Sequence, residues 1–238
     1  MMVLLVSALL LGSPTADARH PCIRLSRPGT RVQGDVRVCP GRYRVPDPAG
    51  RGVLVVTGSG TLLDLTGVTI ESGDSVPERF AGIGVLSAGR DSVTIRGGRI
   101  QGYRFGVRIG GGRGHRLLGI DLSGSRRPAA ADPVGWPGAE GAGLALDSVA
   151  MAVVSGLVAR EARYGVLIIA SRSISITESD LSGNSGWGLQ LWNSSRNELA
   201  RNRSSGILLG EASDSNVIEG NDLTGSAHGI VLVGGAGG

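Results

Sequence analysis

Short runs of alternating apolar and polar residues recur along most of the chain, and each run directly follows a glycine. The glycines that open these runs are Gly84, Gly106, Gly143, Gly165, Gly188, Gly206 and Gly229, at steps of 22, 37, 22, 23, 18 and 23 residues. Alternation with a period of two is typical of β-strands, and repetition at a nearly constant interval is typical of a solenoid. The one long step equals a regular step plus an insertion around residues 125–141.

This pattern predicts an all-β fold, a right-handed parallel β-helix (a solenoid) with about 22 residues per turn. Three short strands fit in one turn, and each turn would rise by about 4.8 Å, the spacing of hydrogen-bonded strands. The first and third residues after each glycine are expected to point inward and stack as aliphatic columns. Asp-Leu-Ser/Thr-Gly segments begin at Asp121, Asp180 and Asp222, and we expect them to form a corner in which the glycine takes a positive φ.

The composition fits a narrow aliphatic core. Of the 238 residues, 41% are hydrophobic but only 3% are aromatic. The net charge is +4 and all 24 basic residues are arginine, which excludes chemistry that needs a lysine Schiff base or a phosphate-loop lysine. The arginines adjoin only at Arg126 and Arg127, so nucleic acid is not expected as a partner. A solvated surface and the attraction of an anionic substrate both remain open.

The chain divides into three parts. Residues 1–18 contain an apolar run that ends in Ala-Asp-Ala, which predicts a signal peptide and a secreted or periplasmic protein without a membrane span. Residues 19–50 are expected to form an N-terminal cap with a disulfide between Cys22 and Cys39. The β-helix is expected over residues 51–238. The sequence stops directly after an apolar strand of the kind that forms the core, and no polar cap follows that strand. We therefore expect missing C-terminal coils or a partner at that end.

Three segments carry a resemblance to a known group of proteins. They are residues 38–43 with the preceding Cys22, residues 63–70 and residues 92–98. They resemble secreted bacterial right-handed β-helix repeat proteins of the NosD-like and carbohydrate-binding/sugar-hydrolase type, which are related in fold to pectate lyases and mannuronan epimerases. The resemblance covers most of residues 20–234. It implies the β-helix fold and a polysaccharide partner, but the group includes lyases, epimerases, hydrolases and proteins without known chemistry.

The outward-facing positions of the first predicted sheet limit the chemistry available there. They are Leu86, Arg108, Ala145, Leu167, Gln190, Leu208 and Val231. A glycosidase needs two carboxylates beside the bond that it cleaves, and this column has none. Its apolar character predicts that something covers it. For β-elimination or epimerisation of a uronic acid, Arg108 with Arg126 would neutralise the sugar carboxylate, and Tyr103 or His115 would act as the base.

The insertion is the best candidate for a binding loop, because long irregular loops in compact solenoids are often functional. Its candidate substrate-binding residues are Arg126, Arg127, Asp132, Trp136 and Glu140, joined by Trp192 as an exposed aromatic side chain. The alternative is a tolerated surface excursion. Phe105, Tyr164 and Trp187 are expected to form a stacked corner ladder rather than a sugar platform. A calcium site at Asp121 and Asp132 has no supporting acidic cluster, so neither a metal nor a cofactor is expected.

Three functions remain open from the sequence. The first is a polysaccharide lyase or epimerase, and the second is a non-catalytic β-helix that binds glycan or assembles on a surface. The third is a NosD-like periplasmic maturation factor.

Overall fold

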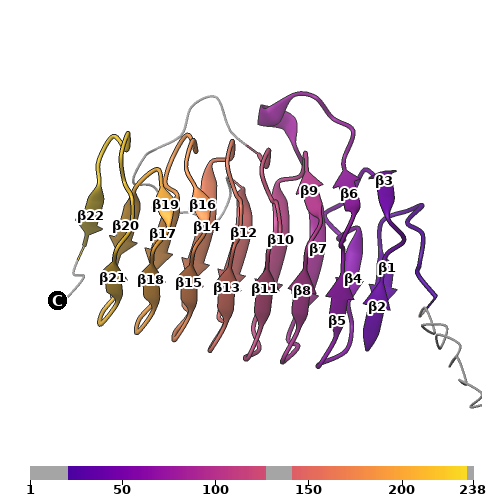
Figure 1. Ribbon diagram of the computed structural model, residues 1–238, viewed down its shortest axis with the longest axis horizontal. Helices are drawn as coiled ribbons and strands as arrows, with labels where there is room; N and C mark the ends of the chain where they lie inside the picture. The colour runs from indigo at the N-terminus through magenta and orange to yellow at the C-terminus, as the bar shows by residue number, and fades with distance from the viewer. Residues whose placement is uncertain (1–20, 127–140, 235–238) are drawn as a thin grey trace, which may run out of the picture.

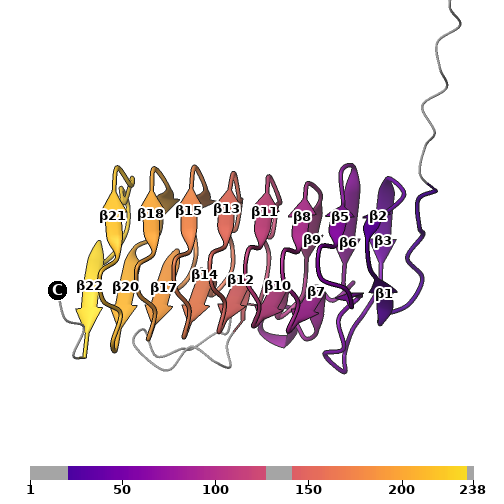
Figure 2. The same ribbon diagram turned by 90° about the horizontal axis from the view of Figure 1, so that it is seen from below.

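A computed structural model describes residues 21–126 and 141–234. They form a parallel β-helix in which successive coils lie side by side along one axis (Figures 1 and 2). The only helix among these residues is the short 3₁₀-helix η1 (Pro77–Arg79). The predicted fold is therefore confirmed.

Sheet 1 runs the whole length of the β-helix and contains nine parallel strands. In spatial order they are β1 (Thr30–Val32), β4 (Leu54–Val56), β7 (Ile83–Ala88), β10 (Phe105–Gly110), β12 (Ala142–Asp147), β14 (Tyr164–Ile169), β17 (Leu189–Trp192), β20 (Ile207–Gly210) and β22 (Ile230–Val233). Their order in space follows their order in the chain, so each coil contributes one strand.

Sheets 2 and 3 complete each coil. Sheet 2 contains β2 (Asp35–Arg37), β5 (Leu62–Asp64), β8 (Thr94–Arg96), β11 (Arg116–Leu118), β13 (Val153–Ser155), β15 (Ser175–Thr177), β18 (Glu198–Ala200) and β21 (Val217–Glu219). Sheet 3 consists of two pieces, β3 (Gly41–Arg44), β6 (Val68–Glu71) and β9 (Arg99–Gln101), and then β16 (Asp180–Leu181) with β19 (Arg203–Ser204). Isolated parallel bridges through Asp121 and Val158 join the two pieces.

The interior is filled by the predicted aliphatic columns. In sheet 1, Val107 pairs with Leu144 and Leu144 with Val166, and all three side chains are fully buried. The column continues through Leu189 and Ile207 in the same core cluster. The last pair of predicted inward residues, Ile230 and Leu232, is instead 49% and 65% exposed, because β22 is the last strand of the described sheet.

Buried amides join neighbouring coils at the corners. The side chain of Asn202 accepts a hydrogen bond from the backbone N–H of Ser179 (3.0 Å) in the preceding coil and donates one to the side chain of Asn221 (3.0 Å) in the next. Asn197 and Asn216 repeat this contact at 2.9 Å. Most buried polar side chains in proteins are hydrogen-bonded, and the bonds that satisfy these amides also tie each coil to the next.

A second apolar cluster lies outside the coil, on the outer face of sheet 1. It includes the outward residues Ala145, Leu167 and Leu208, which are at most 6% exposed. The middle of this column is therefore buried, whereas Leu86 and Val231 are partly exposed and Arg108 is exposed. Phe105 and Tyr164 belong to the same cluster and are also buried, as expected for a corner ladder.

The N-terminal segment contains more β-helix than the sequence indicates. Cys22 and Cys39 form the expected disulfide. However, residues 30–44, which the sequence analysis assigns to a cap, form β1, β2 and β3, and these strands pair with the next coil. The first coil therefore lies within the predicted cap.

A second insertion, which the glycine spacing does not reveal, lies between β6 and β7. Leu54 pairs with Val85, 31 residues later, whereas Val85 pairs with Val107, 22 residues later. The extra residues lie in the connection 72–82, which carries η1 and protrudes from the row of coils (Figure 1).

Two adjacent valines in β13 test the assignment of inner and outer faces. Val154 is fully buried in the core, whereas Val153 is 39% exposed on the outer face. Replacing Val154 by Ala should lower the free energy of unfolding by about 2 kcal/mol, because it removes buried methyl groups and leaves a cavity. Val153→Ala, the matched control, should change it by less than about 0.5 kcal/mol. Equal losses in urea unfolding would contradict the assigned faces.

Candidate functional site

The connection 72–82 is held against the coil by a buried carboxylate. Asp47, 2% exposed, accepts hydrogen bonds from the backbone N–H groups of Arg51 (3.0 Å), Gly52 (2.8 Å) and Ile83 (3.0 Å). Gly82 has a φ of +77°, and a Cβ there would clash with the carbonyl oxygen of Asp47. A glycine is therefore required where the connection rejoins the coil.

One side of this connection forms a basic cavity of about 370 Å³, here named the arginine pocket. Its lining includes the four arginines Arg79, Arg104, Arg108 and Arg126, with Glu78, Phe80 and Phe105. Arg108 comes from the outer face of β10, and Arg79 comes from η1. Four cations and one carboxylate give the pocket a strong positive potential.

The guanidinium groups of this pocket lie close together. Burial, followed by the nearby charges of Arg126 and Arg108, lowers the pKa of Arg104 below its usual value. The guanidinium carbons of Arg104 and Arg108 lie 5.3 Å and 5.5 Å from the centre of the Phe105 ring, a distance typical of cation–π contacts. The aromatic ring thus holds two cations whose charges repel each other.

Arg108 and Arg126 can still bind an anion through their guanidinium groups. Within residues 21–126 and 141–234, neither Arg108 nor Arg126 forms an ion pair with a carboxylate, and the Nε of Arg126 is buried without a hydrogen-bond partner. A buried donor without a partner costs free energy. An anion in the pocket would pair with the guanidinium charges of Arg108 and Arg126.

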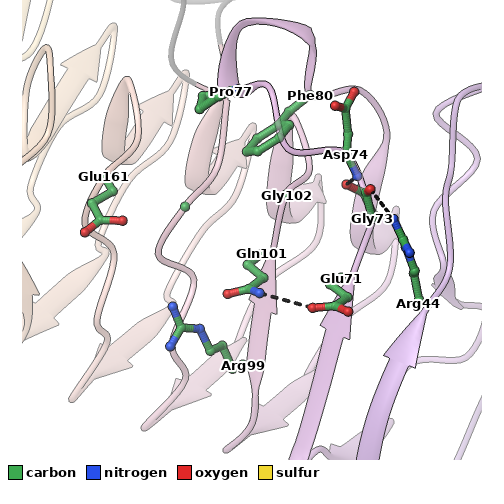
Figure 3. A pocket seen from close by; sticks show the side chains of 12 residues that line it. Arg44, Glu71, Gly73, Asp74, Pro77, Phe80, Arg99, Gln101, Gly102 and Glu161 are labelled. Atoms are coloured by element: carbon green, nitrogen blue, oxygen red, sulfur yellow. Dashed lines mark hydrogen bonds between the residues drawn. The ribbon is translucent and has the colours of Figure 1, made fainter.

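A second cavity, of about 490 Å³, lies on the other side of the connection and is named here the mixed pocket. Its charged and amide side chains are Arg44, Glu71, Asp74, Arg99, Gln101 and Glu161 (Figure 3). Gln101 at the end of β9 donates a hydrogen bond to Glu71 at the end of β6 (3.3 Å). Phe80 lines both pockets. The sequence analysis does not find the mixed pocket, and the 31-residue step before Val85 is the signal that marks it.

The two proposed bases lie inside the coil and away from the arginine pocket. Tyr103 is fully buried, and its hydroxyl donates a hydrogen bond to the carbonyl of Val45 (2.6 Å). Burial, with the charges of Asp47 and Glu71, raises the pKa of Tyr103. His115 is also fully buried. Neither side chain is placed to remove a proton from a sugar bound at Arg108, so the assignment of both as bases is corrected.

The remaining predicted residues divide into four groups. Arg108 and Arg126 share the arginine pocket, as expected. Trp192, expected to be exposed, is 6% exposed and packs where Gly210 of the next coil leaves room for its ring. The residues Arg127, Asp132, Trp136 and Glu140 lie outside the described part of the chain. Asp121 pairs with Arg99 at 3.6 Å rather than with a second acid.

The comparison with protein families can now be stated. The family model for NosD, described as a periplasmic copper-binding protein, matches residues 49–237. The chain belongs to the NosD family. The family description agrees with the expected secreted or periplasmic location. No match was found among curated proteins or solved structures. No helix in the described part of this NosD-family chain has the length and apolar character needed to cross a membrane.

The described residues do not fit a copper site. Copper is bound in proteins mainly by thiolate, thioether and imidazole groups. Within the described ranges, no three His, Cys, Asp or Glu side chains cluster as metal ligands. Both cysteines are in the disulfide, and both ring nitrogens of His115 face backbone partners.

The buried histidine makes stability dependent on pH. Nδ1 of His115 accepts from the N–H of Val93 (3.4 Å), and Nε2 therefore carries the proton and faces the carbonyl of Gly111 (3.3 Å). Burial lowers the pKa of His115, against smaller opposing effects from Gly111 and Asp91. Since protonation is easier in the unfolded chain, the stabilisation is complete above the usual histidine pKa of about 6.5 and is lost as the pH falls below it.

We expect urea unfolding to show a lower free energy at pH 5 than at pH 8, and His115→Gln to reduce this difference. The matched control is His228→Gln, because His228 is exposed. If both variants keep the full difference, His115 is not its source.

Proposed function

We propose that this NosD-family protein is an exported β-helix that binds an acidic polysaccharide in the arginine pocket, without cleaving it. The observation that supports this best is the convergence of Arg104, Arg108 and Arg126 on one cavity. A guanidinium group presents paired N–H donors that match a carboxylate. Uronic acids carry one carboxylate per sugar, so a polyuronate can pair with more than one of the arginines that line the pocket.

The position of the pocket supports a polymer rather than a small ligand. The pocket lies on the outer surface of the coil, between the connection 72–82 and the outer face of sheet 1. Its volume lies within the range of about 300–1,000 Å³ common for ligand sites. A sugar bound at this surface site can belong to a longer chain that extends beyond the pocket.

A copper-linked maturation role is the second candidate, and it is supported by the description of the family. The described residues supply no ligand cluster for it. This role would therefore depend on a partner or on residues outside the described ranges.

Binding should depend on Arg108 more than on an arginine elsewhere on the same coil. Arg108→Ala should weaken binding of oligogalacturonate at least about tenfold in isothermal titration, because it removes a charge-assisted contact to a carboxylate. The matched control is Arg116→Ala: Arg116 is exposed on sheet 2 of the same coil and should have little effect. Equal effects of the two variants would show that binding is only a general attraction to a basic surface.

The non-catalytic part of the proposal has its own test. Polyuronate incubated with the protein should give no rise in absorbance at 235 nm, the signal of an unsaturated uronate, because Tyr103 and His115 lie inside the coil. A commercial pectate lyase serves as the positive control. If the absorbance rises only when the protein is present, the claim that the protein does not cleave its ligand is contradicted. The position of the binding site is then tested separately by Arg108→Ala.

A further inference from the structure

Two cavities with different charge lie on the two sides of the connection 72–82. Phe80 forms part of the wall of both. The arginine pocket has four cations and one carboxylate, whereas the mixed pocket has two arginines, three carboxylates and an amide. A ligand long enough to reach past Phe80 would therefore meet two distinct environments.

The mixed pocket offers donors and acceptors side by side. In Figure 3, Gln101 and Glu71 lie next to each other on adjacent strands, Phe80 and Pro77 lie above them, and Arg99 and Glu161 border the same space. Glu71 is fixed by Gln101 (3.3 Å) and by Arg42 (3.6 Å), so its carboxylate is oriented before any ligand arrives. An oriented carboxylate beside an amide suits a group that both donates and accepts hydrogen bonds.

These features select for uncharged sugar hydroxyl and amide groups. The three carboxylates of the mixed pocket outnumber its two arginines, so a second uronate is less favourable there than in the arginine pocket. A hydroxyl group can donate to Glu71 and accept from Gln101 or Arg99. The apolar surfaces of Pro77 and Phe80 provide a wall for the ring of the sugar.

We propose that the mixed pocket is a second sugar subsite that takes an uncharged unit while the arginine pocket holds an anionic one. The ligand is then an acidic heteropolysaccharide in which uronate and uncharged sugars alternate, rather than a uniform polyuronate. This inference rests on the proposed function, because it uses the arginine pocket as the anionic subsite.

The test compares two kinds of oligosaccharide with the same number of sugars. One is oligogalacturonate, which is charged at every sugar. The other is a set of alternating oligosaccharides from hyaluronan, chondroitin and heparosan, each with one uronate and one uncharged N-acetylhexosamine per repeat. In isothermal titration at one salt concentration, we expect at least one alternating oligosaccharide to bind at least tenfold more tightly than oligogalacturonate.

Variants of the mixed pocket should remove this preference selectively. Gln101→Ala should weaken the preferred alternating ligand about tenfold and leave oligogalacturonate unchanged, whereas Gln33→Ala, an exposed glutamine outside both pockets, should change neither. Gln101→Glu keeps the side-chain size but loses the donor, and should also weaken the alternating ligand. Circular dichroism and urea unfolding confirm that each variant is folded.

The outcomes separate the two proposals. The second subsite is refuted, and the arginine pocket stands, if oligogalacturonate binds through Arg108 but no alternating ligand binds more tightly. The same conclusion follows if neither Gln101 variant changes the affinity for the alternating ligand. If no ligand depends on Arg108, the proposed function fails. Tighter binding of an alternating ligand that is lost in both Gln101 variants supports the second subsite.

Discussion

Backbone hydrogen bonds between successive coils, together with the aliphatic columns inside them, determine where every other side chain lies. Val107, Leu144 and Val166 occupy the same position in three coils and pack on one another in the core. Because parallel strands lie about 4.8 Å apart, an outward residue on one coil is a near neighbour of the equivalent residues on the adjacent coils. A surface site can therefore be assembled from single residues that are far apart in the sequence.

The regular coil also explains why the site depends on a departure from the repeat. The connection 72–82 adds residues between sheets 3 and 1, and Asp47 and Gly82 anchor it where it rejoins the coil. It places Phe80 between the two pockets and brings Arg79 towards Arg108. The regular coils on either side supply further lining residues from β3, β6, β9 and β10 and from the loops beside them. In this protein the repeat provides rigidity, and the insertion provides the cavities.

The repeat itself was predictable from the sequence, because glycine spacing and alternation report directly on coil length and on the inward columns. The site was only partly predictable. The glycine series starts at Gly84, after the connection 72–82, so the glycine spacing contains no signal of the extra length before Val85. Tyr103 and His115 sit at turns between strands, where alternation does not specify direction, and both point inward. Trp192 follows the outward parity, but the space left by Gly210 lets it pack against the next coil.

The family assignment covers the coils over residues 49–237, and the two pockets are formed where the connection 72–82 meets those coils. The most direct measurement of their role is a crystal structure of the protein with a bound uronate-containing oligosaccharide. The account predicts a uronate carboxylate within hydrogen-bond distance of the guanidinium groups of Arg108 and Arg126. An oligosaccharide bound at another face, with both arginines facing solvent, would contradict it.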